Sequence, residues 1–263
     1  MCSFLIQRPQ VSPKDLADGD SMLDPLFRVG VISQTPDPQT TIWAAMHQDY
    51  SEGFVLDTES SWPSEQDCGH NAVKYLLKGG RGHYGPLEHA QIALNVGWFP
   101  HSVMQQARTH RVGISFDVQS FRYTGQRICQ AAKGEIDIEE VFYLRPCGNY
   151  SDRQGKKYAY SLQQRALDLN HCRASAKRYS ELLNHGYAEE HARSILPFDT
   201  RQHFVVSFSL RSFLHFMDLR SKLDAQLEIQ QLCDLMWLLF FEWAPEIATW
   251  YADNRMNKAR LAP

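Results

Sequence analysis

The stretch FVVSFSLRSFLHFMDLR (204–220) sets two kinds of pattern side by side. Its opening part, FVVSFSL (204–210), is rich in β-branched and aromatic residues, which is typical of a strand. A helix is predicted at about 211–220, and a longer one at about 224–243, where apolar residues recur with helical spacing. A strand that leads into long helices indicates the α+β class of fold.

Further elements are predicted on the N-terminal side of this stretch. Strands are predicted at 27–32 and 90–99. A short helix is predicted to end over 70–77, a long amphipathic helix to span 158–183, and another short helix to span 188–195. Stop signals support these boundaries, because Gly79 and Gly186 follow two of the helices and Pro197 follows the third.

Length and composition indicate one ordinary globular domain. The chain has 263 residues, of which 43% are hydrophobic and 22% charged, so a wholly disordered chain is excluded. A chain of this length buries roughly 70–75% of its unfolded surface. The sequence contains no repeat and no low-complexity linker. We therefore predict a single α+β domain over 1–263, with a mixed or antiparallel sheet and long helices.

The cysteines and the apolar segments argue against several protein classes. None of the six cysteines forms a CxxC pair, so buried free thiols are expected in place of a zinc ribbon or a redox centre. The N-terminus lacks the basic and long apolar regions of a signal peptide. The most apolar stretch, 231–250, is interrupted by Asp234, Glu242 and Glu246. A cytoplasmic protein without a membrane span is the resulting expectation.

Arginines gather in the segment 108–127. The segment contains four arginines and one aspartate, which gives it a local charge of +3 in a chain whose net charge is −3. The mildly acidic total excludes a protein that coats polyanions, but it leaves room for one polyanionic ligand. Hydroxyl, amide and aromatic side chains are interleaved with the arginines, at Ser115, Phe116, Gln119, Ser120 and Tyr123. This mixture favours a nucleotide-sized pocket over a solvated basic face.

A second set of basic residues lies further along the chain, at Arg193, Arg201, His203, Arg211, His215 and Arg220. On the predicted helix, Arg211 and His215 are four residues apart and share a face. Arg220 is nine residues from Arg211 and lies on the opposite face. These side chains can serve one pocket only if other segments or other subunits meet there.

Two familiar chemistries find no support in the sequence. Histidine spacing offers no HExxH or HxH pair, so no protein-held metal is predicted. No GxSxG elbow is present and no cysteine has a catalytic signature, which argues against a nucleophilic hydrolase.

The segment ARTHRVGISFDVQSFRYTG (107–125) resembles the signature of flavin-dependent thymidylate synthases, which is Arg-His-Arg, seven or eight residues, then Ser-x-Arg. Here the pattern reads Thr109-His110-Arg111, eight residues, then Ser120-Phe121-Arg122. The likeness extends to PLEH (86–89), ARSILPFDT (192–200) and SLRSFLHFMDLR with AQLEI (209–229). Such ordered motifs are more specific together than any one of them.

The resemblance implies a homotetrameric FAD enzyme that methylates dUMP to dTMP. Methylenetetrahydrofolate would supply the carbon, and NADPH would reduce the flavin. The residues implied for dUMP are Gln105 or Gln106, Arg108, Gln119, Ser120, Phe121, Arg122, Arg193 and Arg220. The residues implied for FAD are His89, Gln91, Arg108, Thr109, His110, Arg111, Ser209, Leu210, Arg211 and His215. Neither nucleic acid nor membrane is expected as a partner.

Arg220 matches the arginine that this family places at the uracil face, so it is the expected catalytic residue. A guanidinium near the uracil O2 and N3 would stabilise the enolate charge that develops during the reaction. The flavin supplies the hydride, and the protein supplies placement and electrostatics. The resemblance implies no cysteine nucleophile.

The sequence also departs from the family pattern. Thr109 stands where the first arginine is usual, and Arg108 precedes it. Val118 replaces a usual Glu or Gln, while Ser209 and His215 replace usual residues in the flavin-contacting part. Two other hypotheses therefore stay open: a non-catalytic nucleotide- or RNA-binding protein that uses the arginines of 108–127, and a relative that binds dUMP without turnover. The resemblance assigns no role to 1–60 and 244–263.

Overall fold

The computed structural model describes residues 23–80, 82–152, 154–256 and 258. Its centre is a four-stranded antiparallel sheet in the order β1-β2-β6-β3. The strands are β1 (Arg28–Gln34), β2 (Gln91–Pro100), β3 (Ile114–Val118) and β6 (Arg201–Ser209). Three of these strands are the predicted ones, whereas β3 was not predicted, because its five residues lie inside the arginine-rich motif.

Alternation along the strands explains which face of the sheet is covered. In β6, Phe204, Val206 and Phe208 are buried while their neighbours are more open, and β2 alternates in the same way. Val206 pairs with Leu94, so the apolar residues of the two strands share one face. That face packs against helices and forms the main core.

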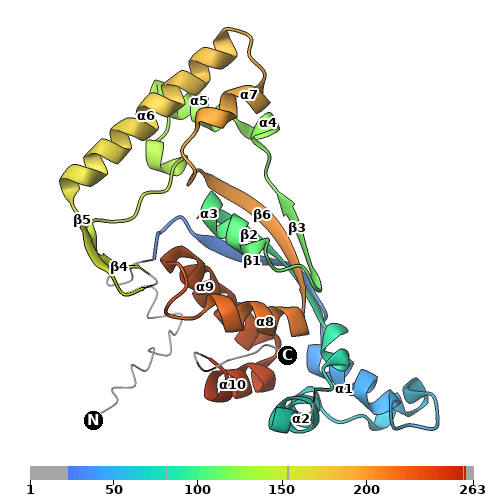
Figure 1. The fold of residues 1–263 in the computed structure, drawn as a ribbon. Helices are drawn as coiled ribbons and strands as arrows, with labels where there is room; N and C mark the ends of the chain where they lie inside the picture. Colours follow the sequence, from blue (N-terminus) through green and yellow to red (C-terminus); the bar gives the residue numbers. More distant parts are fainter. Residues whose placement is uncertain (1–22, 81, 153, 257, 259–263) are drawn as a thin grey trace, which may run out of the picture.

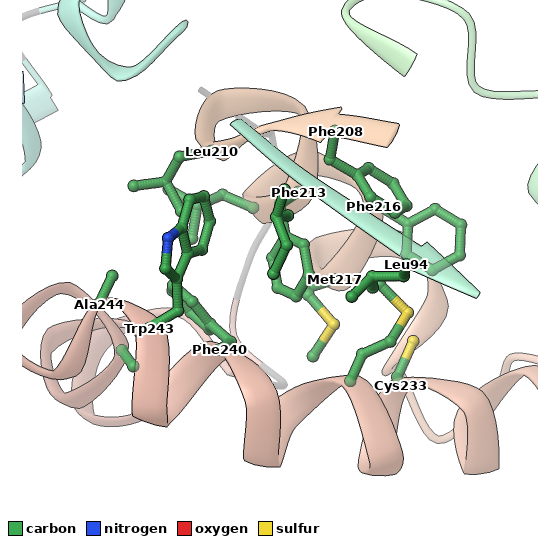
Figure 2. Packing of buried hydrophobic residues seen from close by; sticks show 14 of the residues in the cluster. Leu94, Phe208, Leu210, Phe213, Phe216, Met217, Cys233, Phe240, Trp243 and Ala244 are labelled. Atoms are coloured by element: carbon green, nitrogen blue, oxygen red, sulfur yellow. The ribbon is translucent and has the colours of Figure 1, made fainter. Parts of the chain in front are cut away.

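Three helices at the C-terminal end of the chain build most of this core. They are α8 (Leu210–Arg220), α9 (Leu227–Trp243) and α10 (Pro245–Asn254). Figure 2 shows Phe213 and Phe216 of α8 between the strands and α9, with Phe240 and Trp243 of α9 facing them. The predicted helices at 211–220 and 224–243 are thus confirmed.

Two helices near the N-terminus, α1 (Pro38–Gln48) and α2 (Glu65–Ala72), pack on the same core. The chain passes through η1 (Val55–Ser61) between them, and α2 continues through η2 (Val73–Leu77), η3 (Lys78–Gly80) and η4 (Gly85–Glu88) to the sheet. Ile42 of α1 and Tyr251 of α10 are fully buried. The helices α1 and α10 therefore each contribute residues to the main core.

A second, smaller cluster of apolar residues is held by helices that lie at one end of the sheet (Figure 1). It is formed by α4 (Phe121–Thr124), α5 (Gln126–Lys133), η5 (Ile138–Glu140), α6 (Leu162–Asn184), α7 (Glu189–Ala192) and η6 (Arg193–Ile195). Ile128 of α5 and Tyr179 of α6 are among its fully buried residues. We call residues 121–144 and 162–196 the lobe, and the remainder of the described chain the body.

The long helix starts later than the sequence pattern indicates. It begins at Leu162, because Ser161 caps it by accepting a hydrogen bond from the backbone N–H of Gln164 at 3.3 Å. Tyr158, predicted to be helical, lies in β5 (Lys157–Tyr160), which pairs with β4 (Gly148–Ser151) in a hairpin. The prediction of 158–183 as one helix was therefore wrong at its first turn, since aromatic residues at helical spacing also suit a strand.

The described cysteines carry free thiols, at Cys68, Cys129, Cys147, Cys172 and Cys233. Three of them are buried, as expected, but Cys129 is half-buried and Cys147 is exposed. Burial raises the pKa of Cys68 and raises that of Cys172 to about 11. Within the described residues, no helix is long and apolar enough to cross a membrane, and no group of acidic, histidine and cysteine side chains could hold a metal ion.

Candidate functional site

The loop between α3 (His101–Ala107) and β3 carries the Thr109-His110-Arg111 motif. Gly113 closes the loop with a φ of 66°, and a Cβ there would lie 2.2 Å from the hydroxyl of Ser212. Glycine is therefore needed both for the backbone conformation and for the close approach. The Ser212 hydroxyl donates to the carbonyl of Val112 at 2.6 Å, which pins the loop to the start of α8.

Arg220, at the end of α8, is bonded to this loop. Its Nε donates to Nε2 of His110 at 2.9 Å. Its Nη2 donates to the Thr109 hydroxyl at 2.8 Å and to the carbonyl of Gln106 at 3.1 Å. Among the described residues, none accepts a hydrogen bond from Nη1. No carboxylate of the described residues forms an ion pair with this guanidinium. Arg220 is thus a half-buried cation with one edge held and one edge free.

His110 is only 6% exposed and packs against the rings of His215 and Phe216, whose centroids are 5.2 Å and 5.0 Å away. Burial, followed by the charges of Arg220 and His215, lowers the pKa of His110 to about 4. The imidazole is therefore neutral at pH 7. Because its Nε2 accepts from Arg220, the ring proton is on Nδ1.

An open hollow of about 530 Å³ lies beside this loop. It is lined by Gln105, Arg108, Thr109, His110, Arg111, Ile114, Ser115 and Phe116. Arg108 and Arg111 are exposed, and no described acidic residue pairs with either of them. Two unpaired guanidinium groups at the rim of a hollow suit a ligand with several negative charges.

A second group of predicted residues lies where η4 and the start of α8 meet. His89 and Gln91 are exposed here, and Gln91 Nε2 donates to the carbonyl of Glu88 at 2.7 Å. Arg211 donates to the Glu88 carboxylate at 2.6 Å. Glu88 therefore holds the end of this site together, although the sequence reasoning assigned it no role.

Ser209 and Leu210 do not present their side chains to a ligand. Ser209 is 3% exposed, and its hydroxyl accepts from the backbone N–H of Ser212 as the cap of α8. Leu210 is fully buried in the main core (Figure 2). Their structural role is to fix the start of α8, on which Arg211 and His215 stand.

A third group lies on the lobe. Ser120 caps α4 and accepts from the backbone N–H of Arg122 at 3.4 Å. Arg122 is exposed and has a loose ion pair of 4.0 Å with Glu190, while Arg193 is exposed at the start of η6. Phe121, by contrast, is buried in the lobe core, so only its backbone is available to a ligand.

Two arginines of the sequence clusters point inward. Arg201 is buried and bonds the carboxylate of Asp24 at 2.6 Å and the carbonyls of Glu139 and Trp98 at 2.6 Å and 2.8 Å. Arg127 donates to the carbonyl of Arg201 and to the side chain of Gln119, and burial lowers its pKa to about 10. Both arginines therefore join the lobe to the sheet, and neither counts among the exposed cations that could bind a ligand.

The described contacts join two of these three groups directly. The loop group and the α8 group are continuous, because His110 and His215 face each other. The lobe group follows β3 in the chain, and no hydrogen bond or ion pair of the described residues joins Arg122 or Arg193 to Arg220.

Gln226 is a contact that sequence reasoning missed. Its side chain accepts from Gln106 Nε2 and donates to the Ser102 hydroxyl at 3.1 Å and to the carboxylate of Glu228 at 2.7 Å. Glu228 is in turn paired with Arg145 at 2.6 Å. Gln106 is 120 residues from Gln226, and Arg145 is 83 residues from Glu228, so no local pattern could have revealed these two contacts.

Comparison with known proteins shows the family of this chain. The sequence model of the thymidylate synthase complementing protein family matches residues 30–246, and the chain belongs to this family. The flavin-dependent thymidylate synthase of Halobacterium salinarum is 30% identical over 250 residues, which cover 90% of this chain and all of that protein. The corresponding protein of Haloarcula marismortui is 30% identical over 89% of this chain and 99% of its own length.

A solved structure shares the fold. The UMP/dUMP methylase PolB from Streptomyces cacaoi, bound with 5-Br UMP, superimposes with a TM-score of 0.66 at 18% identity over 90% of this chain and 96% of that one. The family inferred from the sequence motifs is therefore confirmed, and the chain is an enzyme of this methyltransferase family.

Proposed function

We propose that this enzyme converts dUMP to dTMP by reductive methylation, with methylenetetrahydrofolate as carbon donor, NADPH as reductant and FAD as cofactor. The observation that carries the proposal is the state of Arg220. Its cation is held by three neutral acceptors, and its Nη1 edge is free among the described residues. A fixed positive charge without a carboxylate partner is suited to stabilise negative charge that develops on a uracil ring.

The residues beside the hollow fit a flavin dinucleotide. Arg108 and Arg111 offer unpaired guanidinium groups for its pyrophosphate, and His89, Gln91, Arg211 and His215 offer donors near the start of α8. When bound, the flavin would supply the hydride, which protein side chains cannot do. The contribution of this chain is to bind the phosphates, to orient the ring system and to keep Arg220 charged.

The lobe supplies the residues for the substrate phosphate in this proposal. Arg122 and Arg193 are exposed and close to each other in chain packing, since α4 contacts α7. Arginine forks bind phosphate through paired hydrogen bonds, and the Ser120 hydroxyl could add another. Gln119 and Gln105 or Gln106 would complete the contacts to dUMP.

A homotetramer with shared sites is part of the proposal, as the family resemblance implies. No described hydrogen bond or ion pair links Arg122 to Arg220, and a dUMP held by the lobe of one subunit and the body of another would contact both arginines. Since dUMP and folates are small metabolites of the cytoplasm, we propose that the enzyme works there.

Tritium release from [5-³H]dUMP tests the function. We expect release and dTMP formation only when FAD, NADPH and methylenetetrahydrofolate are all supplied. A purified protein that stays colourless after FAD is added and binds dUMP without releasing tritium would overturn the proposal. Gel filtration with light scattering tests the tetramer, and a monomer that is fully active would contradict the shared site.

A further inference from the structure

The three acceptors that hold Arg220 belong to one short segment of chain. They are the carbonyl of Gln106, the hydroxyl of Thr109 and Nε2 of His110. Together they engage Nε and Nη2 and leave Nη1 as the free edge. Because a guanidinium is planar, fixing these two nitrogens also fixes the direction in which Nη1 points.

Thr109 has a particular part in this arrangement. Its hydroxyl donates to the carbonyl of Gln106 at 2.7 Å and accepts from Nη2 of Arg220 at 2.8 Å. The same carbonyl of Gln106 also accepts from Nη2. The hydroxyl proton is therefore committed, which turns a lone pair of the oxygen toward Arg220. The side chain of Arg108, one residue earlier, is exposed and takes no part in these bonds.

The acceptors around Arg220 are neutral, so the positive charge of its guanidinium is not compensated by a neighbouring negative charge. A carboxylate in the position of Thr109 would neutralise the cation, and a second arginine there would repel it. A hydroxyl holds the guanidinium by a charge-assisted hydrogen bond without either effect. The neutral ring of His110 contributes in the same way.

We propose that Thr109 is a positioning residue that acts through Arg220: its hydroxyl orients the guanidinium so that Nη1 faces the reacting uracil. The proposal rests on the proposed function, in which Arg220 is the catalytic residue. It differs from the role that the sequence resemblance implies for Thr109, which is a direct contact with FAD. The two roles are separable, because only one of them depends on the side chain at position 220.

The experiment compares Thr109→Val, which keeps the shape and removes the hydroxyl, with Thr109→Ser, which keeps the hydroxyl. Thr249→Val is the matched control, because Thr249 also donates to a backbone carbonyl, at 2.8 Å, but lies exposed on α10. The holoenzyme is assayed by tritium release, and flavin per subunit is measured by absorbance.

We expect Thr109→Val to lower kcat about 10- to 100-fold, as the loss of a hydrogen bond to a charged group does, with KM for dUMP within about twofold. Thr109→Ser should retain kcat within about threefold, and Thr249→Val should match the wild type. Flavin content should be unchanged in all three variants. In an Arg220→Lys background, Thr109→Val should have less than about a threefold effect, since the partner of the hydroxyl has gone.

Each contrary result overturns the proposal. An unchanged kcat in Thr109→Val removes the role, and an equal loss in the Arg220→Lys background shows that Thr109 acts independently of Arg220. A loss of flavin restores the direct contact with FAD. If valine prevents folding, Thr109→Ala against Thr109→Ser makes the same comparison. An inactive wild type would instead overturn the proposed function, which the assay of the unmodified enzyme decides first.

Discussion

The body and the lobe hold arginines in opposite ways. In the body, Arg220 stands on a helix packed against the main core and is fixed by three short hydrogen bonds. On the lobe, Arg122 is exposed, and its ion pair with Glu190 is 4.0 Å long. A group that acts on a developing charge needs a fixed direction, whereas a group that captures a phosphate can adjust as the ligand arrives.

The connection between the two regions is also made by arginine. Arg201, the first residue of β6, ties the body residue Asp24 to the lobe residue Glu139. The rings of Phe27 and Tyr143 flank its guanidinium at 5.7 Å and 5.2 Å. Arginine is therefore a buried structural tie at Arg201, a held charge at Arg220 and an exposed charge at Arg122, and the differences lie in burial and partners.

The largest effect is expected from Arg220→Ala. The variant should form dTMP about 10²- to 10³-fold more slowly, because an oriented charge at the reacting ring is lost. Flavin absorbance should be retained, since the hollow keeps Arg108 and Arg111. Turnover close to that of the wild type, measured by tritium release, would remove Arg220 from the catalytic role.

Arg201→Ala should be the most destabilising change among these arginines. Removal of one partner from a buried ion pair costs about 3–5 kcal/mol, and Asp24 would be left without its partner. Arg178→Ala is the control, because its pair with Glu181 is exposed and should contribute less than about 0.5 kcal/mol. Thermal melting of both variants tests this, and equal melting temperatures would contradict the role of Arg201 as a tie.

Arg122→Ala should affect binding without affecting stability. We expect KM for dUMP to rise about 10- to 100-fold, as the loss of a charge-assisted bond to phosphate implies, while the melting temperature stays within error. The effect should be weaker for deoxyuridine, which has no phosphate. A fall in kcat at unchanged KM would show that the lobe arginine acts in the chemical step.

The pKa of His110 predicts a dependence of stability on pH. Its value in the folded protein is about 4, below the ordinary value of 6.5 that applies when the chain is unfolded. Between these values only the unfolded chain binds the proton, so the free energy of unfolding falls as the pH falls. The loss from His110 between pH 7 and pH 5 is about 2 kcal/mol.

His110→Asn removes this titrating group and tests the assignment. The wild type should lose more thermal stability than the variant when the pH is lowered from 7 to 5. Equal losses in the two proteins would show that His110 is not the group that titrates. Activity of the wild type should fall only at lower pH, as the pH approaches 4, because protonated His110 cannot accept from Arg220.

The smallest effects are expected at the cysteines. Alanine at Cys68, Cys129, Cys147, Cys172 or Cys233 should leave activity measurable, since the proposed chemistry uses no thiol nucleophile. Cys233 lies in the main core and should cost some stability as a small cavity forms (Figure 2). Complete loss of activity in a folded variant would overturn the proposed mechanism.

Much of the fold was open to prediction from local pattern. The strands at 27–32, 90–99 and 204–210 and the helices after them were found because their apolar residues recur with periods that short-range geometry dictates. The helix at 158–183 was predicted with a wrong start, since Tyr158 belongs to a hairpin. The strand β3 was missed because its five residues lie inside the arginine-rich motif, although Ile114, Phe116 and Val118 alternate with polar residues as a strand requires.

For the candidate site, the sequence predicted which residue types are present but not which of their side chains are exposed or what they contact. The motifs identified the family, and the geometry separated exposed arginines from buried ones. Arg127 and Arg201 look no different from Arg122 in sequence, but they face inward and bond backbone carbonyls. The side chains of Ser209 and Leu210 are likewise taken up by a helix cap and by the core.

The sequence by itself determined the family, the α+β class and the concentration of positive charge in 108–127, because motif order and periodicity are properties of the chain alone. Only the tertiary structure decided that Arg220 meets Thr109 and His110, which are more than a hundred residues away. The direction of a guanidinium depends on acceptors that folding brings together. The sequence determines the charge of the Arg220 guanidinium, and the packing of α8 against the motif loop determines its orientation.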